Sequence, residues 1–280
     1  MTKFKTMIKK GWVGLAAVVL IGGSVATMTF TLGQNGAVYA AQNVAPITDA
    51  VKVNNKDQIT KNQVKAKYTL IVKTTADLEK DFKEKLGSQK GITTKQLAEQ
   101  IKVQMECQTP GTKDISGEQA AAYAAASIKK VYGVDLKGYT AEPGFEKSNI
   151  PNSDVWAVDF RDPKNIQVSY LVKVNSVSGE LSEISLGKDY GVIDLNLNKN
   201  MNDPSWKQKA VKDVSALLPS TVTVKNSKVI ETNPIYGVTV LCELSDGSAH
   251  VIILYGENKE ITTYCVFSNG YDGSFDNASN

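Results

Sequence analysis

The sequence has few of the residues on which enzymes and metal sites usually depend. Its 280 residues include one histidine, His250, and three cysteines, Cys107, Cys242 and Cys265. None of these residues is spaced like zinc ligands, and three cysteines are too few for a disulfide scaffold. Gly-x-Ser-x-Gly, His-Glu-x-x-His, P-loop and dinucleotide motifs are also absent. We therefore expect no catalytic residues, no cofactor and no metal, and an ordinary strand position for His250.

Two of the cysteines lie on the first and third strands of one predicted meander. Pairing through the two turns places both Cys242 and Cys265 nearly opposite Val251 and His250 of the middle strand. The two thiols are then separated by two strand spacings, roughly 10 Å, which exceeds the reach of a disulfide. Both cysteines are expected to be free.

The N-terminal 40 residues resemble an export signal. Four lysines precede an uncharged stretch at 12–33, and Val38-Tyr39-Ala40 is typical of a cleavage site. The uncharged stretch is also long enough, at roughly 33 Å as a helix, to span a bilayer uncleaved. Residues 1–40 are thus a signal peptide or a membrane anchor, and the remainder is expected outside the cytoplasm, secreted or anchored by this single helix.

Charge argues against a nucleic-acid partner. The chain has a formal net charge of +3, and its first 40 residues hold four lysines and no acid, so the remainder carries 3 − 4 = −1. A body of that charge lacks the basic surface that nucleic-acid binding requires.

Residues 41–110 are predicted to be a polar tether followed by two amphipathic helices. Leu78, Phe82 and Leu86 stand on one face of the first helix, which ends at Gly87. The second helix begins at a capping box, Thr93 with Gln96, supported by a staple of Ile92 on Leu97. The stretch at 68–72 reads either as a short strand or as the approach to the first helix.

Residues 111–195 form the first of two predicted helix-on-sheet modules. Ser116 and Gln119 make a capping box, an alanine-rich stripe follows, and Gly133 ends the helix. The hydrophobic period then changes from helical to alternating over 155–160, 168–174 and 181–186.

The same order recurs in residues 196–268. Asp203 is a predicted N-cap with Pro204 at the first helical position, and Pro219 stops the helix. Four strands are expected at 222–230, 236–244, 249–255 and 260–267, and a flexible tail at 269–280. The predicted class is α+β, with two modules in which one helix covers one face of an antiparallel sheet.

The first module resembles the PepSY family over residues 112–188. The resemblance depends on the helix-opening phrase Ile115-Ser-Gly-Glu-Gln-Ala-Ala-Ala122, on Trp156-Ala-Val158, and on the strand and turn Tyr170–Leu181. Asn175 and Ser178 replace the Asp and Thr typical of that turn and keep its local bonding. The resemblance implies a cystatin-like helix-on-sheet fold and a role in restraining or sensing peptidases. The second module is similar in layout only.

Several polar and aromatic residues could serve a ligand but have ordinary alternatives. Trp156 and Trp206 are either ligand platforms or, as we expect, core residues. Asp159, Arg161 and Asp162 could bind a partner's charge but read as a solvated loop. Asp272, Ser274 and Asp276 alternate like calcium ligands, but the glycine and glutamate of that loop are missing, which favours a disordered tail.

We therefore expect a non-catalytic regulatory or interaction protein of the cell envelope. Its partner would be an envelope peptidase or an extended peptide, paired with a free sheet edge at Tyr170–Val174. The alternative is a binding module for a cell-wall polymer or a small ligand. A curved aromatic groove would favour the polymer, and an open strand edge beside an apolar patch would favour the protein partner.

Overall fold

The computed structural model describes residues 68–87, 93–188 and 198–274. All of them belong to one compact unit, Val53–Asn280. The other unit, Met1–Lys52, lies outside the described residues, and so do the predicted export segment and the tether. No helix within the described ranges is long and apolar enough to cross a membrane.

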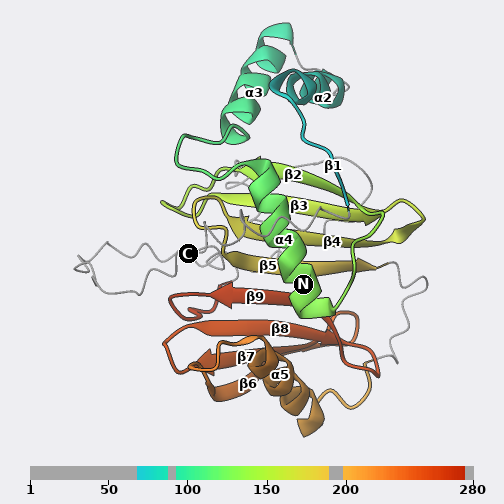
Figure 1. Cartoon of the computed structure of the whole chain (residues 1–280), viewed down its shortest axis with the longest axis vertical. Coiled ribbons are helices and arrows are strands. Elements are labelled where there is room, and N and C mark those ends of the chain that lie inside the picture. Colours follow the sequence, from blue (N-terminus) through green and yellow to red (C-terminus); the bar gives the residue numbers. More distant parts are fainter. Residues whose placement is uncertain (1–67, 88–92, 189–197, 275–280) are drawn as a thin grey trace, which may run out of the picture. The chain divides into compact units, whose positions relative to one another are not determined.

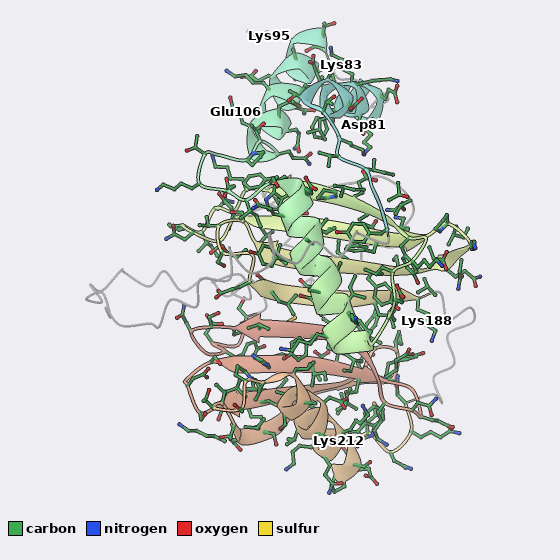
Figure 2. All side chains as sticks on the ribbon, in the orientation of Figure 1. Asp81, Lys83, Lys95, Glu106, Lys188 and Lys212 are labelled. Atoms are coloured by element: carbon green, nitrogen blue, oxygen red, sulfur yellow. The ribbon has the colours of Figure 1, made fainter. Side chains whose placement is uncertain are left out.

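The two amphipathic helices form where the sequence predicts them. They are α2 (Thr75–Gly87) and α3 (Thr94–Cys107), and they pack against each other. The capping box of Thr93 and Gln96 is confirmed, whereas Ile92 of the predicted staple lies outside the described residues. Charged side chains of both signs cover this hairpin (Figure 2).

The first module is built on α4 (Gly117–Tyr132), whose two ends confirm the predicted signals. The Gln119 amide donates to Ser116 Oγ at 3.2 Å, and the Ser116 amide donates to Gln119 Oε1 at 2.9 Å. At the other end Gly133 takes the left-handed conformation, φ 70°, which a glycine adopts without steric cost.

Five strands belong to the first half of the sheet. They are β1 (Thr69–Leu70), β2 (Thr140–Glu146), β3 (Val155–Asp162), β4 (Asn165–Asn175) and β5 (Leu181–Lys188). The last three were predicted, and β1 agrees with the strand alternative for residues 68–72. Strand β2 was not, because Pro143 and Gly144 in its middle are unfavourable in strands and hide its alternation.

The second half contains one helix and four strands, all predicted to within a few residues. They are α5 (Pro204–Leu217), β6 (Val224–Asn233), β7 (Gly237–Leu244), β8 (Ala249–Tyr255) and β9 (Glu260–Phe267). Asp203 caps α5 by accepting from the Ser205 amide at 2.7 Å.

The α+β class is confirmed, but two separate sheets are not formed. The strands make one nine-stranded sheet in the order β1-β2-β3-β4-β5-β9-β8-β7-β6. The final strands of the two halves pair antiparallel, with Ile184 opposite Tyr264 at the centre of the seam. An alternating sequence identifies a strand without naming its neighbour, so the sequence could not exclude this pairing.

Both α4 and α5 lie on one face of this sheet (Figure 1). A continuous row of buried side chains crosses the face beneath them: Val158, Val172, Ile184, Tyr264, Ile252 and Val240. We call this the helix face and the opposite one the far face. The far face of the second half holds a smaller apolar cluster: Leu241, Ala249, Val251, Cys265 and Phe267.

The segment Tyr170–Val174 is not a free edge, which corrects the expectation from sequence. It lies in β4, which pairs with β3 on one side and with β5 on the other. The segment has one charged residue, Lys173, because it belongs to a strand with neighbours on both sides. Any added strand must pair elsewhere.

Candidate interaction edge of the sheet

An open sheet has two edges, and each edge strand presents unpaired backbone donors and acceptors. Here the edges belong to β1 with β2 at one end and to β6 at the other. The two edges differ in length and in what lies against them.

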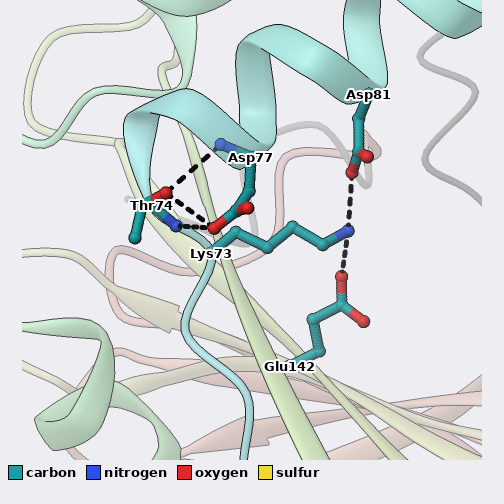
Figure 3. A network of polar contacts seen from close by, with 5 residues as sticks. All are labelled: Lys73, Thr74, Asp77, Asp81 and Glu142. Carbon is teal, nitrogen blue, oxygen red and sulfur yellow. Dashed lines mark hydrogen bonds and ion pairs between the residues drawn. The ribbon is translucent and has the colours of Figure 1, made fainter.

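The edge at β1 and β2 is occupied by the chain itself. Strand β1 pairs in parallel with Thr140 and Ala141 of β2. Immediately after it, Lys73 places its ammonium 2.5 Å from Glu142 of β2 and 3.1 Å from Asp81 of α2 (Figure 3). Partial burial lowers the pKa of Lys73, but the hydrogen bonds to Glu142 and Asp81 outweigh it, so the net shift is upward.

Two further contacts hold the helices that lie next to this edge. Thr74 and Asp77 cap α2 reciprocally, with the Thr74 amide donating to Asp77 Oδ2 at 2.9 Å (Figure 3). At the far end of β2, the Lys147 amide donates to the carbonyl of Cys107, the last residue of α3, at 3.0 Å. Between these points Pro143 has no amide hydrogen to offer a guest.

The β6 edge is different. This strand is ten residues long, and no described strand pairs with its outer side. The Ser245 amide donates to the Thr223 carbonyl at 2.9 Å, so Ser245 directs its backbone groups at β6. Every second residue of an antiparallel strand faces the same neighbour, so Glu243 and Leu241 of β7 also direct their amides and carbonyls at β6. Lys228, opposite Leu241, therefore bonds to β7, and Val229, opposite Val240, turns its amide and carbonyl outward.

Strand β6 also carries features that limit non-specific pairing. Its register shifts between Val224 and Asn226 and again between Val229 and Glu231, so a bulge stands at each end of a regular stretch, 226–229. Within that stretch the outward amide of Ser227 donates to Asn226 Oδ1 at 2.9 Å. The regular stretch is thus short, and one of its donors is already satisfied locally.

The two sides of β6 differ in chemistry. Val224, Ser227 and Val229 pair with helix-face residues, and Val229 keeps 40% of its surface exposed. On the far face stands Lys228, exposed and without a carboxylate within ion-pair distance among the described residues. An extended guest on this edge would meet a largely apolar side and, on the far face, a charged side that carries Lys228 together with Glu231 and Glu243.

His250 lies in β8 as predicted, buried and on the helix face, where its Nδ1 is 2.5 Å from the Tyr264 hydroxyl. Burial lowers its pKa to about 4. Cys242 is its cross-strand partner, and burial raises the pKa of that thiol to about 11. Both groups are held neutral, the opposite of the thiolate–imidazolium pair of a cysteine nucleophile.

The predicted separation of the cysteines is confirmed. Cys242 pairs with His250 and Cys265 with Val251, so the two lie on opposite faces with β8 between them. All three cysteines are free. Burial raises the pKa of Cys265 above its usual range, and Cys107 is exposed at the end of α3.

Trp156 and Trp206 are both core residues, as expected. Trp156 fills the space under α4, and its indole donates to the Ile115 carbonyl at 3.0 Å. Trp206 is 2% exposed and donates to the Asn200 carbonyl at 3.1 Å, with the Lys259 ammonium 5.0 Å from its ring centre.

The predicted charged loop is part of β3 instead. Arg161 Nε donates to Asp159 Oδ2 at 2.7 Å, and Asp162 accepts from the Lys164 amide at 2.8 Å. Asp159 and Arg161 neutralise each other, and Asp162 accepts a backbone amide of the turn that follows β3.

The C-terminal segment packs against the far face before the described residues end. The Tyr271 ring meets Phe267 edge-on with centroids 5.0 Å apart. Asp272 accepts from the Ser274 amide at 2.9 Å, and Asp276 lies outside the described residues. No group of three potential metal ligands occurs in the described part of the chain.

No protein-family model and no curated protein matches the chain. Among solved structures it is similar to the Bacillus megaterium YpeB C-terminal domain, at 10% identity and a TM-score of 0.36. The similarity covers 56% of this chain and 65% of that one, less than two thirds of its length. A likeness this weak carries neither a fold nor a function across.

Sequence reasoning missed two features of the edges. The cap of α2 was visible as Thr74-x-x-Asp77, a short reciprocal pattern before an amphipathic run. The exposure of β6 was less visible. Lys225, Lys228 and Glu231 interrupt its alternation, as charges and bulges do on edge strands, and this was a usable signal.

Proposed function

We propose that this chain is a non-catalytic interaction protein of the cell envelope that binds an extended peptide segment as an added strand on β6. The observation that carries the proposal is the position of β6 at the end of the sheet order. It is ten residues long, whereas β1 at the other edge has two and is tied to its surroundings by Lys73. Backbone pairing provides affinity for such a guest, and flanking side chains provide selectivity.

The source of the segment is proposed to be an envelope peptidase. Support comes from the resemblance of residues 112–188 to PepSY-type modules. The guest is held and not cut, since His250 and Cys242 are buried in their neutral forms.

The location outside the cytoplasm is proposed from the basic head, the apolar stretch and the small-residue exit of residues 1–40. A phosphatase reporter fused after Asn43 is expected to be active. An intact but inactive fusion contradicts the location. An N-terminus at Ala41 in the native protein, found by mass spectrometry, distinguishes secretion from anchoring.

The alternative, a cell-wall polymer, has less support. Polymer sites usually offer aromatic faces to the ligand, and every described tryptophan, tyrosine and phenylalanine is at least partly buried. The large apolar side chains that are exposed are aliphatic: Ile71, Val72, Val103, Ile166, Leu171, Val177 and Val229.

Proline substitution in β6 tests the added strand. Decapeptides selected by phage display on the exported body, residues 41–280, serve as probes. Val229→Pro removes an outward amide, so peptide binding is expected to fall at least tenfold while the urea midpoint changes little. Lys228→Pro removes an amide bonded to β7 and is expected to destabilise the fold.

Two controls complete the test. Ile166→Ala, at a 90% exposed position far along the chain from β6, is expected to leave binding unchanged. Mass spectra of the peptides after incubation are expected to show intact chains. Full binding by a folded Val229→Pro protein contradicts the edge proposal, and peptide cleavage contradicts the non-catalytic role.

A further inference from the structure

The helix-face side of the β6 edge is apolar but incompletely covered. Val224 is half-buried against the core under α5, and Val229 is exposed to 40%. Leu217, Leu218 and Val222, where α5 ends and the chain turns towards β6, are also half-buried against that core. A side chain placed beside them from outside would bury apolar surface that the chain itself leaves in water.

The far-face side of the same edge carries one lysine, Lys228, on the same face as two exposed acids, Glu231 of β6 and Glu243 of β7. Lys228 is exposed, and its inner cross-strand neighbour, Leu241, is a buried apolar residue that offers the ammonium no charge. Lys225, at the bulge between Val224 and Asn226, is also exposed and without a described carboxylate partner. A guest residue directly opposite Lys228 would lie about 5 Å away between Cβ atoms, close enough to pair with it.

The bulges define the length of the regular pairing. Between them only Asn226, Ser227, Lys228 and Val229 keep an unbroken register with β7. Because successive side chains of a strand point to opposite faces, a guest over this stretch presents two residues to each side.

We propose that the guest segment alternates, with apolar side chains towards α5 and an acidic side chain opposite Lys228. This inference rests on the proposed function and adds the guest's sequence pattern to it. An extended chain with every second residue apolar and an Asp or Glu between them is the class of partner that this edge fits.

A charge reversal tests the pattern. Random decapeptides are selected on the exported body and, in parallel, on Lys228→Glu and on Lys164→Glu, a lysine exposed in the turn between β3 and β4. We expect the unchanged protein and Lys164→Glu to enrich alternating peptides with a central Asp or Glu. Lys228→Glu is expected to enrich Lys or Arg at the same position.

The affinities of two synthetic peptides, identical except for a central Glu or Lys, quantify the effect. A cross-strand charge pair changes affinity by up to about fivefold, so the ratio of the two affinities should invert between the unchanged protein and Lys228→Glu.

The outcomes separate the inference from the function on which it rests. Binding that Val229→Pro abolishes but that shows no charge preference, or none that Lys228→Glu reverses, overturns the guest pattern and leaves strand addition standing. Enriched peptides without alternation overturn the pattern too. Binding that survives Val229→Pro in a folded protein overturns both.

Discussion

The two halves of the sheet are built on one plan and differ on the face away from the helices. Counting outward from the seam, Val172 in β4 corresponds to Ile252 in β8, and Val158 in β3 corresponds to Val240 in β7. The final strand of each half meets the other's at Ile184 and Tyr264, so the halves are related by an approximate two-fold rotation. All of these helix-face positions are buried and apolar.

The two helices reach their shared face by different packing. Helix α4 presents small residues, Ala120 and Ala124, and the sheet supplies the bulk through Trp156 and Phe160. Helix α5 places Trp206 four residues before buried Ala210 and eight before buried Val214, which is the spacing of Ala120 from Ala124 and Ile128 in α4. The gap between helix and sheet is filled from opposite sides in the two halves.

The far faces differ in chemistry. Leu171 of β4 is 39% exposed, and beside it Lys173 lies 3.2 Å from Glu183. At the position equivalent to Leu171, Val251 is fully buried in the apolar cluster against which Ile230 and Tyr271 pack. The residues of the helix face therefore form the core that both halves have in common. The residues of the far face differ between the halves although the fold is the same.

The largest expected effect comes from the helix side. Trp206→Ala is expected to reduce the free energy of unfolding by about 3–5 kcal/mol, because it leaves a large cavity under α5. Ala120→Gly at the equivalent position of α4 is expected to cost about 1 kcal/mol. Urea titration measures both. Similar losses of unfolding free energy at the two positions would contradict the view that the sheet fills the space under α4 and the helix fills the space under α5.

Acid is expected to weaken the second half through His250. Tyr170 occupies the equivalent place in the first half and stays neutral in acid, because burial raises its pKa to about 12. Burial lowers the pKa of His250 to about 4, with Asp246 opposing and Lys130 adding to that shift. The unfolded chain takes up this proton near pH 6.5 and the folded chain only near 4, so stability falls as pH decreases between these values, by on the order of 3 kcal/mol.

Carboxylates also titrate in this range and change the stability of the protein. The contribution of His250 is therefore measured as the difference between the unchanged protein and a variant without this histidine. Unfolding free energies of the unchanged protein and of His250→Gln are compared from pH 7 to pH 4. The unchanged protein is expected to lose more stability over the interval. Parallel profiles would show that His250 is protonated as readily in the folded state as in the unfolded one.

The far faces are expected to respond unequally to the same truncation. Val251→Ala is expected to cost about 2 kcal/mol, from lost apolar burial and a residual cavity. Leu171→Ala, at the exposed equivalent, is expected to cost less than about 1 kcal/mol. Thermal or urea unfolding decides. Equal losses would mean that the far face of the first half is covered as fully as that of the second.

The smallest effects concern the helix caps. Ser116→Ala removes one bond of the capping box on α4 and is expected to cost about 1 kcal/mol at every pH. Asp203→Ala is expected to destabilise α5 at neutral pH and less in acid. The bonds to Ser205 lower the pKa of Asp203, and their contribution disappears as pH falls through that lowered value. If the loss of stability caused by Ser116→Ala depended on pH, the capping box of α4 would not consist of uncharged groups alone.

Much of the local structure was predictable because its causes are local. The caps at Thr93, Ser116 and Asp203 and the stop at Gly133 act within four residues, and the predicted helices begin and end there. Hairpin turns fixed the register of β7, β8 and β9, which is why the separation of Cys242 and Cys265 was predictable. The candidate site was not, because it depends on which strand is left at the edge.

The sequence by itself determined the helices, most of the strands, the strand position of His250 and the core positions of Trp156 and Trp206, since each follows from spacing, capping and hydrophobic period. Only the tertiary structure decided that the two halves share one sheet, that Tyr170–Val174 lies inside it and that β6 lies at its edge. The physical reason is that backbone hydrogen bonds between strands are the same for every pair. The choice of partner depends on long-range packing that local sequence patterns do not record.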